Sequence, residues 1–182
     1  ISGNYSDQKG IVINSDFKRY SIRLNLDRKI FKNFSVGTHM TASHTISNSV
    51  ATDTGGEDGT ISGALRMNPI QPVYEDELTG AYTQINVPGI LVPNPVATAK
   101  ERKFNNATSR LLGDIYAQWE IIPDLKLKVS LGADVMYHKT NRYTPSNIYQ
   151  SGGVASAYVG VNKSINWLNE NTLTWNKTFA EE

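Results

Sequence analysis

Hydrophobic and polar residues alternate with a period of two along most of this chain. The segment "SDFKRYSIRLNLD", residues 15–27, shows the pattern clearly. Its apolar positions include Tyr20, Ile22, Leu24 and Leu26. The polar positions between and beside them include Arg19, Ser21, Arg23 and Asn25. Because successive side chains point to opposite faces of a strand, the segment predicts a strand that separates an apolar medium from a wet one.

The same alternation recurs in four later segments, and the opening residues add a further short strand. These segments are "FSVGTHMTAS" (34–43), "GDIYAQWEII" (113–122), "LKLKVSLGADVMYH" (125–138) and "INWLNENTLTWNKTF" (165–179). In the last segment Asn169 and Asn171 interrupt the apolar face. The pattern predicts an all-β fold, an antiparallel meander of about six strands, with no convincing helix.

The connections between the predicted strands alternate in length. "FKN" at residues 31–33 and the pair Pro123–Asp124 read as tight turns, whereas residues 50–109 and 144–162 form long loops. In a meander every second connection emerges at the same end of the sheet, so we expect the two long loops to lie together. Short turns at one end and long loops at the other are the layout of an outer-membrane β-barrel.

Composition excludes some classes of protein but does not distinguish a soluble β fold from a membrane β-barrel. The chain has 182 residues, a net charge of +1, no cysteine and a mean hydropathy of -0.38. No thiolate site or disulfide is therefore possible, and the charge gives no reason to expect a nucleic-acid partner. No run of about 18 apolar residues indicates a transmembrane helix. A soluble antiparallel sandwich or a small lipocalin-like barrel would alternate in the same way, so both classes stay open on pattern alone.

Three features of the stripes favour a membrane barrel. The alternation of residues 125–138 is longer than the usual soluble strand of about 5 or 6 residues. Aromatic residues such as Phe34, Trp119 and Tyr137 lie toward the ends of the apolar stripes, where membrane interfaces would be. The polar stripes carry Lys, Arg, Asp and Glu, which a water-filled lumen accepts.

Candidate catalytic and metal-binding residues are few. The chain has three histidines, His39, His44 and His138, which would have to converge with carboxylates to hold a metal. The acidic loop "DTGGEDG" lacks the ligand spacing of a calcium loop and reads as a flexible loop tip; it contains Asp53, Glu57 and Asp58. No nucleophile motif or phosphate-binding glycine loop is present. We therefore predict no enzyme activity, no cofactor and no metal.

Four loop tyrosines are the better candidates for contacts with a ligand or partner. They are Tyr74, Tyr82, Tyr149 and Tyr158, and they flank "EDELTGA" and "QSGGVASA". A tyrosine offers a flat apolar ring with a hydroxyl handle, which suits a sugar ring or a protein surface. The alternative is that these side chains pin the loops onto the barrel rim.

Several long segments also occur in a recognisable order along the chain. They are "ISGNYSDQKGIVINSDFKRYSIRLNLD", "NPVATA" with "NNATSRLLGDIYAQWEI", "LKLKVSLGAD", "NRYTPSNIY" and "INWLNENTLTWNKTF". Together they resemble the SusC/RagA family of TonB-linked outer-membrane transporters, and the likeness extends over essentially all 182 residues.

The resemblance implies a plugged barrel of about 22 strands in the bacterial outer membrane. Such a transporter imports oligosaccharides or peptides and works with TonB and a SusD-like surface lipoprotein. About six strands are roughly a quarter of that barrel, and no plug or TonB-contacting segment is recognisable. We therefore expect residues 1–182 to be a partial barrel excised from a longer protein. A soluble β-sandwich that binds glycans or mediates adhesion is the alternative.

In the barrel interpretation, one side of each strand contacts lipid and the other side contacts the lumen. We expect lipid to contact Tyr20, Ile22, Leu24, Leu26, Leu127, Val129 and Leu131. We expect the lumen to contact Arg23, Asn25, Lys128 and Ser130.

Overall fold

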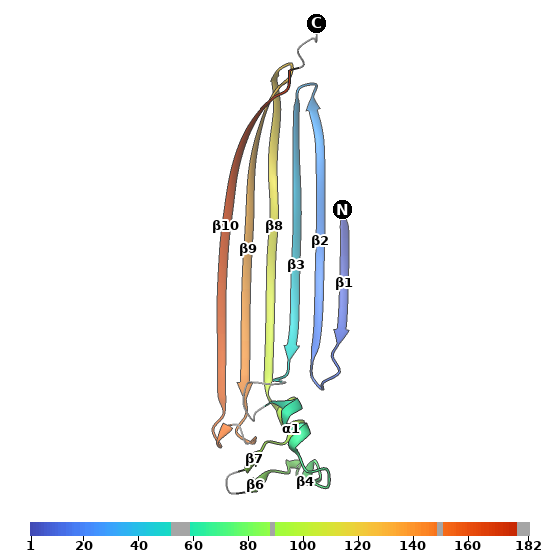
Figure 1. The fold of residues 1–182 in the computed structure, drawn as a ribbon, viewed down its shortest axis with the longest axis vertical. Coiled ribbons are helices and arrows are strands. Elements are labelled where there is room, and N and C mark those ends of the chain that lie inside the picture. Colours follow the sequence, from blue (N-terminus) through green and yellow to red (C-terminus); the bar gives the residue numbers. More distant parts are fainter. Residues whose placement is uncertain (52–58, 88–89, 149–150, 178–182) are drawn as a thin grey trace.

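Long antiparallel strands dominate the computed structural model, which describes residues 1–51, 59–87, 90–148 and 151–177. Six of them form one sheet in the order β1-β2-β3-β8-β9-β10 (Figure 1). The strands are β1 (Ser2–Lys9), β2 (Asp16–Phe31), β3 (Phe34–Ser49), β8 (Lys103–Ile122), β9 (Leu125–Thr144) and β10 (Ser156–Trp175). The predicted six-stranded antiparallel meander is confirmed.

Two tight turns lie side by side at one end of the sheet. Lys32 and Asn33 join β2 to β3, and Pro123 and Asp124 join β8 to β9. Asp124 has a φ of 70°, a left-handed conformation that Asp adopts more readily than most residues. The N–H of Glu120 donates to the carbonyl of Asn33 at 2.8 Å, which ties the first turn to β8. The longer connections leave the opposite end (Figure 1).

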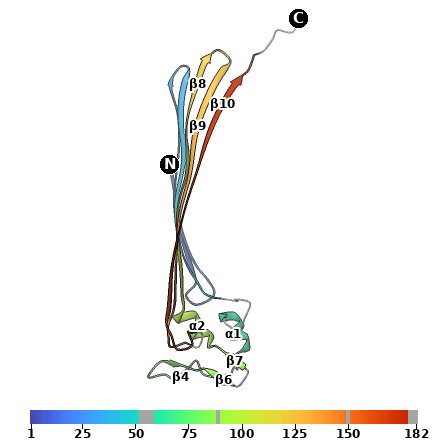
Figure 2. The ribbon, with the colours of Figure 1, turned by 90° about the vertical axis from the view of Figure 1, so that its left-hand side faces the viewer.

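Residues 59–87 and 90–102, called the loop unit, form small elements at that opposite end (Figure 2). Its helices are α1 (Thr60–Arg66) and α2 (Pro95–Glu101). Its short strands are β4 (Tyr74–Asp76), β5 (Ala81–Tyr82), β6 (Ile85–Val87) and β7 (Ile90–Val92), which pair as the hairpins β4-β5 and β6-β7. The expectation of no helix is wrong, because the structure contains α1 and α2. The sequence did not reveal them because a helix of seven residues is too short to show a periodic apolar stripe.

The long connections are shorter than the sequence predicted. β8 begins at Lys103, so residues 103–109 belong to a strand and not to the loop predicted for residues 50–109. Likewise, β10 begins at Ser156, inside the loop predicted for residues 144–162. Residues 103–109 are mostly polar and lack clear alternation, whereas at the start of β10 Ala157, Val159 and Val161 continue the apolar stripe of the strand. Pairing with the neighbouring strands extends both strands, as where the Asn105 side chain donates to Asn48 Oδ1 at 2.9 Å.

The most deeply buried side chains lie among the loops and not on the sheet. Those at most 5% exposed include Val92, Asn94, Ala97, Thr98, Ala99 and Ile148. By contrast, Ile22 on β2 is 62% exposed and Trp167 on β10 is 78% exposed. Among the described residues, neither helix has the length and hydropathy that crossing a membrane requires.

Candidate functional site

The strand register gathers the apolar stripes on one side of the sheet, called here the apolar face. Residues directly opposite each other on antiparallel strands share a face. One row across five strands consists of Ile22, Ala42, Leu111, Val135 and Ile165. The next row consists of Leu24, Met40, Gly113, Ala133 and Trp167. The stripes seen separately in the sequence therefore form one continuous apolar surface.

Polar exceptions on the apolar face satisfy part of their hydrogen bonding locally. Asn171 donates to Asn169 Oδ1 at 2.7 Å, so these two interruptions of β10 pair with each other. The Thr38 hydroxyl donates to the backbone carbonyl of Asp114 at 2.9 Å. Arg28 continues the stripe of β2 opposite Val36, close to the tight turn.

Aromatic rows bound the apolar face at both ends. Tyr20 lies at the level of Tyr137 near the loops, and the Tyr5 and Tyr20 rings are 5.0 Å apart. Phe34 lies opposite Trp119 near the tight turns. The levels of Trp119 and Tyr137 are separated by about ten residues of strand, roughly 33 Å, which a strand tilted by about 40° reduces to about 25 Å of membrane thickness. That is the height of the apolar band of a transmembrane barrel.

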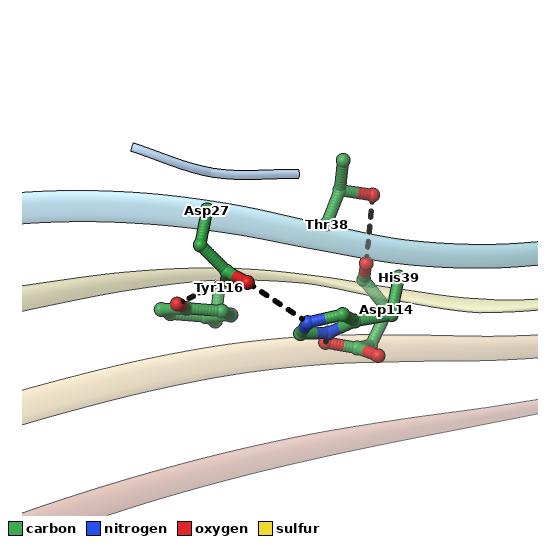
Figure 3. A network of polar contacts seen from close by, with 5 residues as sticks. All are labelled: Asp27, Thr38, His39, Asp114 and Tyr116. Carbon is green, nitrogen blue, oxygen red and sulfur yellow. Dashed lines mark hydrogen bonds and ion pairs between the residues drawn. The ribbon is translucent and has the colours of Figure 1, made fainter. Parts of the chain in front are cut away.

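The opposite side, called the polar face, carries a hydrogen-bonded network across β2, β3 and β8 (Figure 3). The Tyr116 hydroxyl donates to Asp27 Oδ1 at 2.6 Å. His39 lies between two carboxylates, with Nδ1 3.3 Å from Asp114 Oδ2 and Nε2 3.5 Å from Asp27 Oδ2. The His39 and Tyr116 rings are stacked with centroids 6.0 Å apart. The network presents oriented donors and acceptors to water.

Gly37 provides the space for this arrangement. It lies on β3 opposite Tyr116 on β8 and Asp27 on β2. A Cβ atom at Gly37 would overlap the Tyr116 ring and the Asp27 carboxylate. The absence of a side chain therefore lets Tyr116 lie across β3 and reach β2.

Further charged pairs extend the polar face toward β9. Arg110 binds Asp134 through two hydrogen bonds of 2.8 and 2.7 Å, the bidentate geometry of a guanidinium–carboxylate pair. Lys128 lies over the Tyr116 ring, 4.4 Å from its centroid. These residues place Asp27, Asp114 and Asp134 among cations and donors on one wetted surface.

The histidines behave as ordinary polar side chains in the described part of the chain. The register places His39 and His138 on the polar face. His138 Nδ1 lies 2.8 Å from the Thr108 hydroxyl, and His44 Nδ1 lies 2.8 Å from the Ser109 hydroxyl near the loop end. No group of three or more ligating side chains among the described residues could hold a metal ion.

The structure brings together two of the four candidate tyrosines. Tyr74 and Tyr82 are directly opposite each other in the β4-β5 hairpin, with ring centroids 5.2 Å apart. The Tyr82 hydroxyl donates to Glu101 Oε1 at 2.7 Å, and Lys100 Nζ donates to the Tyr74 hydroxyl at 3.2 Å. Burial, and then the bond to Glu101, raise the pKa of Tyr82 above its usual range. These contacts hold the hairpin against the end of α2.

Asn94 makes the second connection between this hairpin and α2, and sequence reasoning did not single it out. Its Oδ1 accepts from the N–H groups of Val96 and Ala97, which caps the helix. Its Nδ2 donates to the carbonyls of Val73 and Thr83 at 2.8 and 3.1 Å. The available signal was the Asn-Pro pair that begins "NPVATA", because Asn at the cap and Pro at the first helical position favour a helix start.

The other candidate tyrosines lie elsewhere. Tyr158 belongs to β10 and not to a loop, because its strand pairs it with Arg142 of β9. It is 57% exposed, and the Arg142 guanidinium carbon lies 5.8 Å from its ring centroid. Tyr149 lies outside the described residues, as do Asp53, Glu57 and Asp58 of the acidic loop.

A long-stranded sheet with one continuous apolar face bounded by aromatic rows, and a charged opposite face, is a segment of a large transmembrane β-barrel. No family model matches the chain. It is 35% identical to TonB-dependent receptor P3 of Formosa agariphila over 99% of its own length, and 32% identical to TonB-dependent receptor SusC of Bacteroides thetaiotaomicron over 74%. The chain belongs to the SusC/RagA family of TonB-dependent receptors.

The chain matches only part of these larger proteins. It spans 18% of the Formosa receptor and 15% of SusC. A chain in the structure of the RagAB peptide importer in its closed-closed state superimposes with a TM-score of 0.74 at 23% identity. That superposition covers 97% of this chain and 20% of the importer chain. The structural match therefore supports the sheet topology as part of a larger barrel.

Proposed function

We propose that this chain forms wall and loops of an outer-membrane TonB-dependent transporter that imports oligosaccharides or peptides. The observation that carries the proposal is the exposed apolar face, on which Ile22 is 62% and Trp167 78% exposed. A soluble glycan-binding or adhesion module would have to cover this face with protein, whereas lipid covers it in a barrel. The names of the relatives, TonB-dependent receptors and a peptide importer, support the transport role.

In this proposal the two faces and the two ends of the sheet have distinct roles. The apolar face contacts lipid, and the polar face, with its network around His39 and Tyr116, lines the lumen. The loop unit lies on the extracellular side, where recognition residues are carried on a rigid scaffold. TonB acts through the whole protein.

The loop unit also offers a surface for a partner of the SusD type. Around the β4-β5 hairpin, Ile70 is 83% exposed, Val73 41% and Leu78 98%. Exposed apolar side chains grouped on one small element are typical of a protein–protein contact. We propose that this part of the loop unit contacts a surface lipoprotein that acts as a lid.

The tyrosines have separate places in the proposal. Tyr74 and Tyr82 are half-buried in the β4-β5 hairpin, so only part of each ring is accessible to a ligand or partner. Tyr158 is 57% exposed on the polar face at the loop end of β10. We propose that it contacts substrate entering the lumen, while Tyr74 and Tyr82 shape the hairpin that contacts the substrate or the lid.

Transport by the full-length protein tests this function. The gene is deleted in its host, and uptake of labelled oligosaccharides and peptides is measured with the wild-type gene restored, with and without functional TonB. We expect uptake of one substrate class that requires both the protein and TonB. Unchanged uptake of both classes in the deletion strain would contradict the transport role.

Alanine variants in the same strain test the tyrosines. Tyr74→Ala with Tyr82→Ala is compared with Tyr158→Ala after correct folding has been confirmed for each. We expect the pair to weaken lid association or substrate affinity, and Tyr158→Ala to weaken substrate affinity alone. Wild-type values of uptake, affinity and lid association in both variants would leave the tyrosines with a purely structural role.

A further inference from the structure

Two lysines stand on the apolar face at its loop end. Lys139 on β9 lies opposite Ala107 and Val161, and Lys163 on β10 lies opposite Tyr137. The register therefore places both on the same face as the apolar rows, as diagonal neighbours on adjacent strands. Both side chains are exposed.

Neither lysine has a charged partner among the described residues. No hydrogen bond or ion pair joins Lys139 or Lys163 to another described side chain. The acidic residues on the described part of this face are Asp7 and Asp16, on β1 and β2, and Asp7 lies 3.9 Å from Lys18. Two like charges at diagonal positions repel each other, so an anion between them would stabilise this part of the sheet.

The lysines lie at a defined height along the strands. Lys163 is at the level of Tyr137 and Tyr20, in the aromatic row that bounds the apolar face, and Lys139 is one row further toward the loops. When the apolar face lies in lipid, an aromatic row marks the level of the headgroups. A lysine there keeps its stem along the hydrocarbon and extends its ammonium group to the headgroup phosphates.

We propose that Lys139 and Lys163 form a binding site for the phosphate-bearing headgroup of an anionic lipid in the leaflet next to the loop unit. Two ammonium groups at adjacent positions match the charge of a headgroup phosphate, and the aliphatic neighbours Val161 and Ile165 contact its acyl chains. Lys103, on the same face opposite Tyr143, adds a third cation nearer the loops. This inference rests on the proposed membrane location of the apolar face.

The test uses the full-length protein inserted into vesicles of phosphatidylcholine that contain phosphatidylglycerol with the same acyl chains. Binding of labelled phosphatidylglycerol is measured for the wild type and for Lys139→Gln with Lys163→Gln. Each lysine near the membrane surface strengthens binding of an anionic lipid by about five- to sixfold. We therefore expect the double variant, which lacks both, to bind phosphatidylglycerol roughly thirtyfold more weakly than the wild type. Labelled phosphatidylcholine should show no difference between the two proteins.

Two further variants make the result specific. Lys29→Gln with Lys126→Gln removes the same charge from the polar face and should bind like the wild type. Lys139→Arg with Lys163→Arg keeps both charges and should restore binding. Equal binding of phosphatidylglycerol by the wild type and the Lys139/Lys163 glutamine variant, or no preference of the wild type for phosphatidylglycerol, would overturn the inference.

Insertion into the vesicles is measured separately by resistance of the strands to protease. Inserted protein whose lipid binding ignores Lys139 and Lys163 overturns this inference alone. Failure of the wild type to insert would overturn both this inference and the proposed function.

Discussion

Gly37 shows how one residue without a side chain organises the polar face. It is buried beneath the Tyr116 ring, whose hydroxyl reaches Asp27 on the next strand but one. The alternation within each strand shows from the sequence alone which residues share a face of the sheet, because that pattern is local. The reach of Tyr116 across β3 was not predictable, because it depends on the register between strands that are far apart in the sequence.

Replacing Gly37 with alanine should displace Tyr116 and break its bond to Asp27. We expect the overpacked site to lower the free energy of unfolding of the full-length barrel by about 1 to 3 kcal/mol. Urea unfolding in vesicles measures the change. Tyr116→Phe keeps the ring and removes the hydroxyl, so it should be milder, and a Gly37→Ala protein as stable as the wild type would contradict the packing described.

At the scale of elements, α2 depends on Asn94 for both its start and its attachment to the β4-β5 hairpin. Helix propensity alone does not stabilise a seven-residue helix in water. Asn94 is 4% exposed and uses both ends of its amide, as a cap for α2 and as a donor to Val73 and Thr83. Asn94 therefore joins α2 to the hairpin, in addition to the contacts of Tyr74 and Tyr82 with Lys100 and Glu101.

Asn94→Ala should loosen the loop unit without unfolding the sheet. It removes the cap and the side-chain donor to the Thr83 carbonyl, whereas the Val73 carbonyl still accepts from the Thr83 N–H. We expect the change to cost about 2 kcal/mol locally. Hydrogen exchange of the full-length protein should show faster exchange in α2 and the β4-β5 hairpin, and unchanged exchange in β8 and β9. Asn94→Asp keeps the cap acceptor and should be intermediate. Unaltered exchange in α2 would contradict the role assigned to Asn94.

The sequence predicted the long strands better than the loop unit for a physical reason. A strand such as β9 carries its alternation over many residues, so the two media on its sides are visible in the sequence itself. The helices α1 and α2 and the strand ends near Lys103 and Ser156 form through contacts with other segments. Tyr74 and Tyr82 flank one short segment of the sequence, but the contact between their rings and their bonds with Lys100 and Glu101 depend on the folded loop.

At the scale of the whole molecule, the sheet lacks a protein covering. Its apolar face is exposed from Ile22 to Trp167, and β1 and β10 are the edges of the described sheet. Open strand edges and an uncovered apolar face both promote association between chains in water. In a closed barrel the edge strands are paired, and lipid covers the apolar face.

The isolated chain of residues 1–182 should therefore aggregate in buffer and require detergent to stay dispersed. Light scattering and analytical ultracentrifugation, with and without detergent above its critical micelle concentration, measure this directly. A monodisperse monomer that unfolds cooperatively without detergent would speak for the soluble β-module.

The most direct test of the membrane assignment compares arginine on the two faces of β9 in the full-length protein. Leu131 lies near the middle of the apolar band, between the levels of Trp119 and Tyr137, and its neighbour Ser130 lies on the polar face. Reversible unfolding from lipid vesicles is measured for Leu131→Arg and Ser130→Arg. The account predicts that Leu131→Arg lowers the free energy of unfolding by about 2 to 4 kcal/mol and Ser130→Arg by much less. Equal losses for the two variants, or a larger loss for Ser130→Arg, would contradict the assignment of the apolar face to lipid.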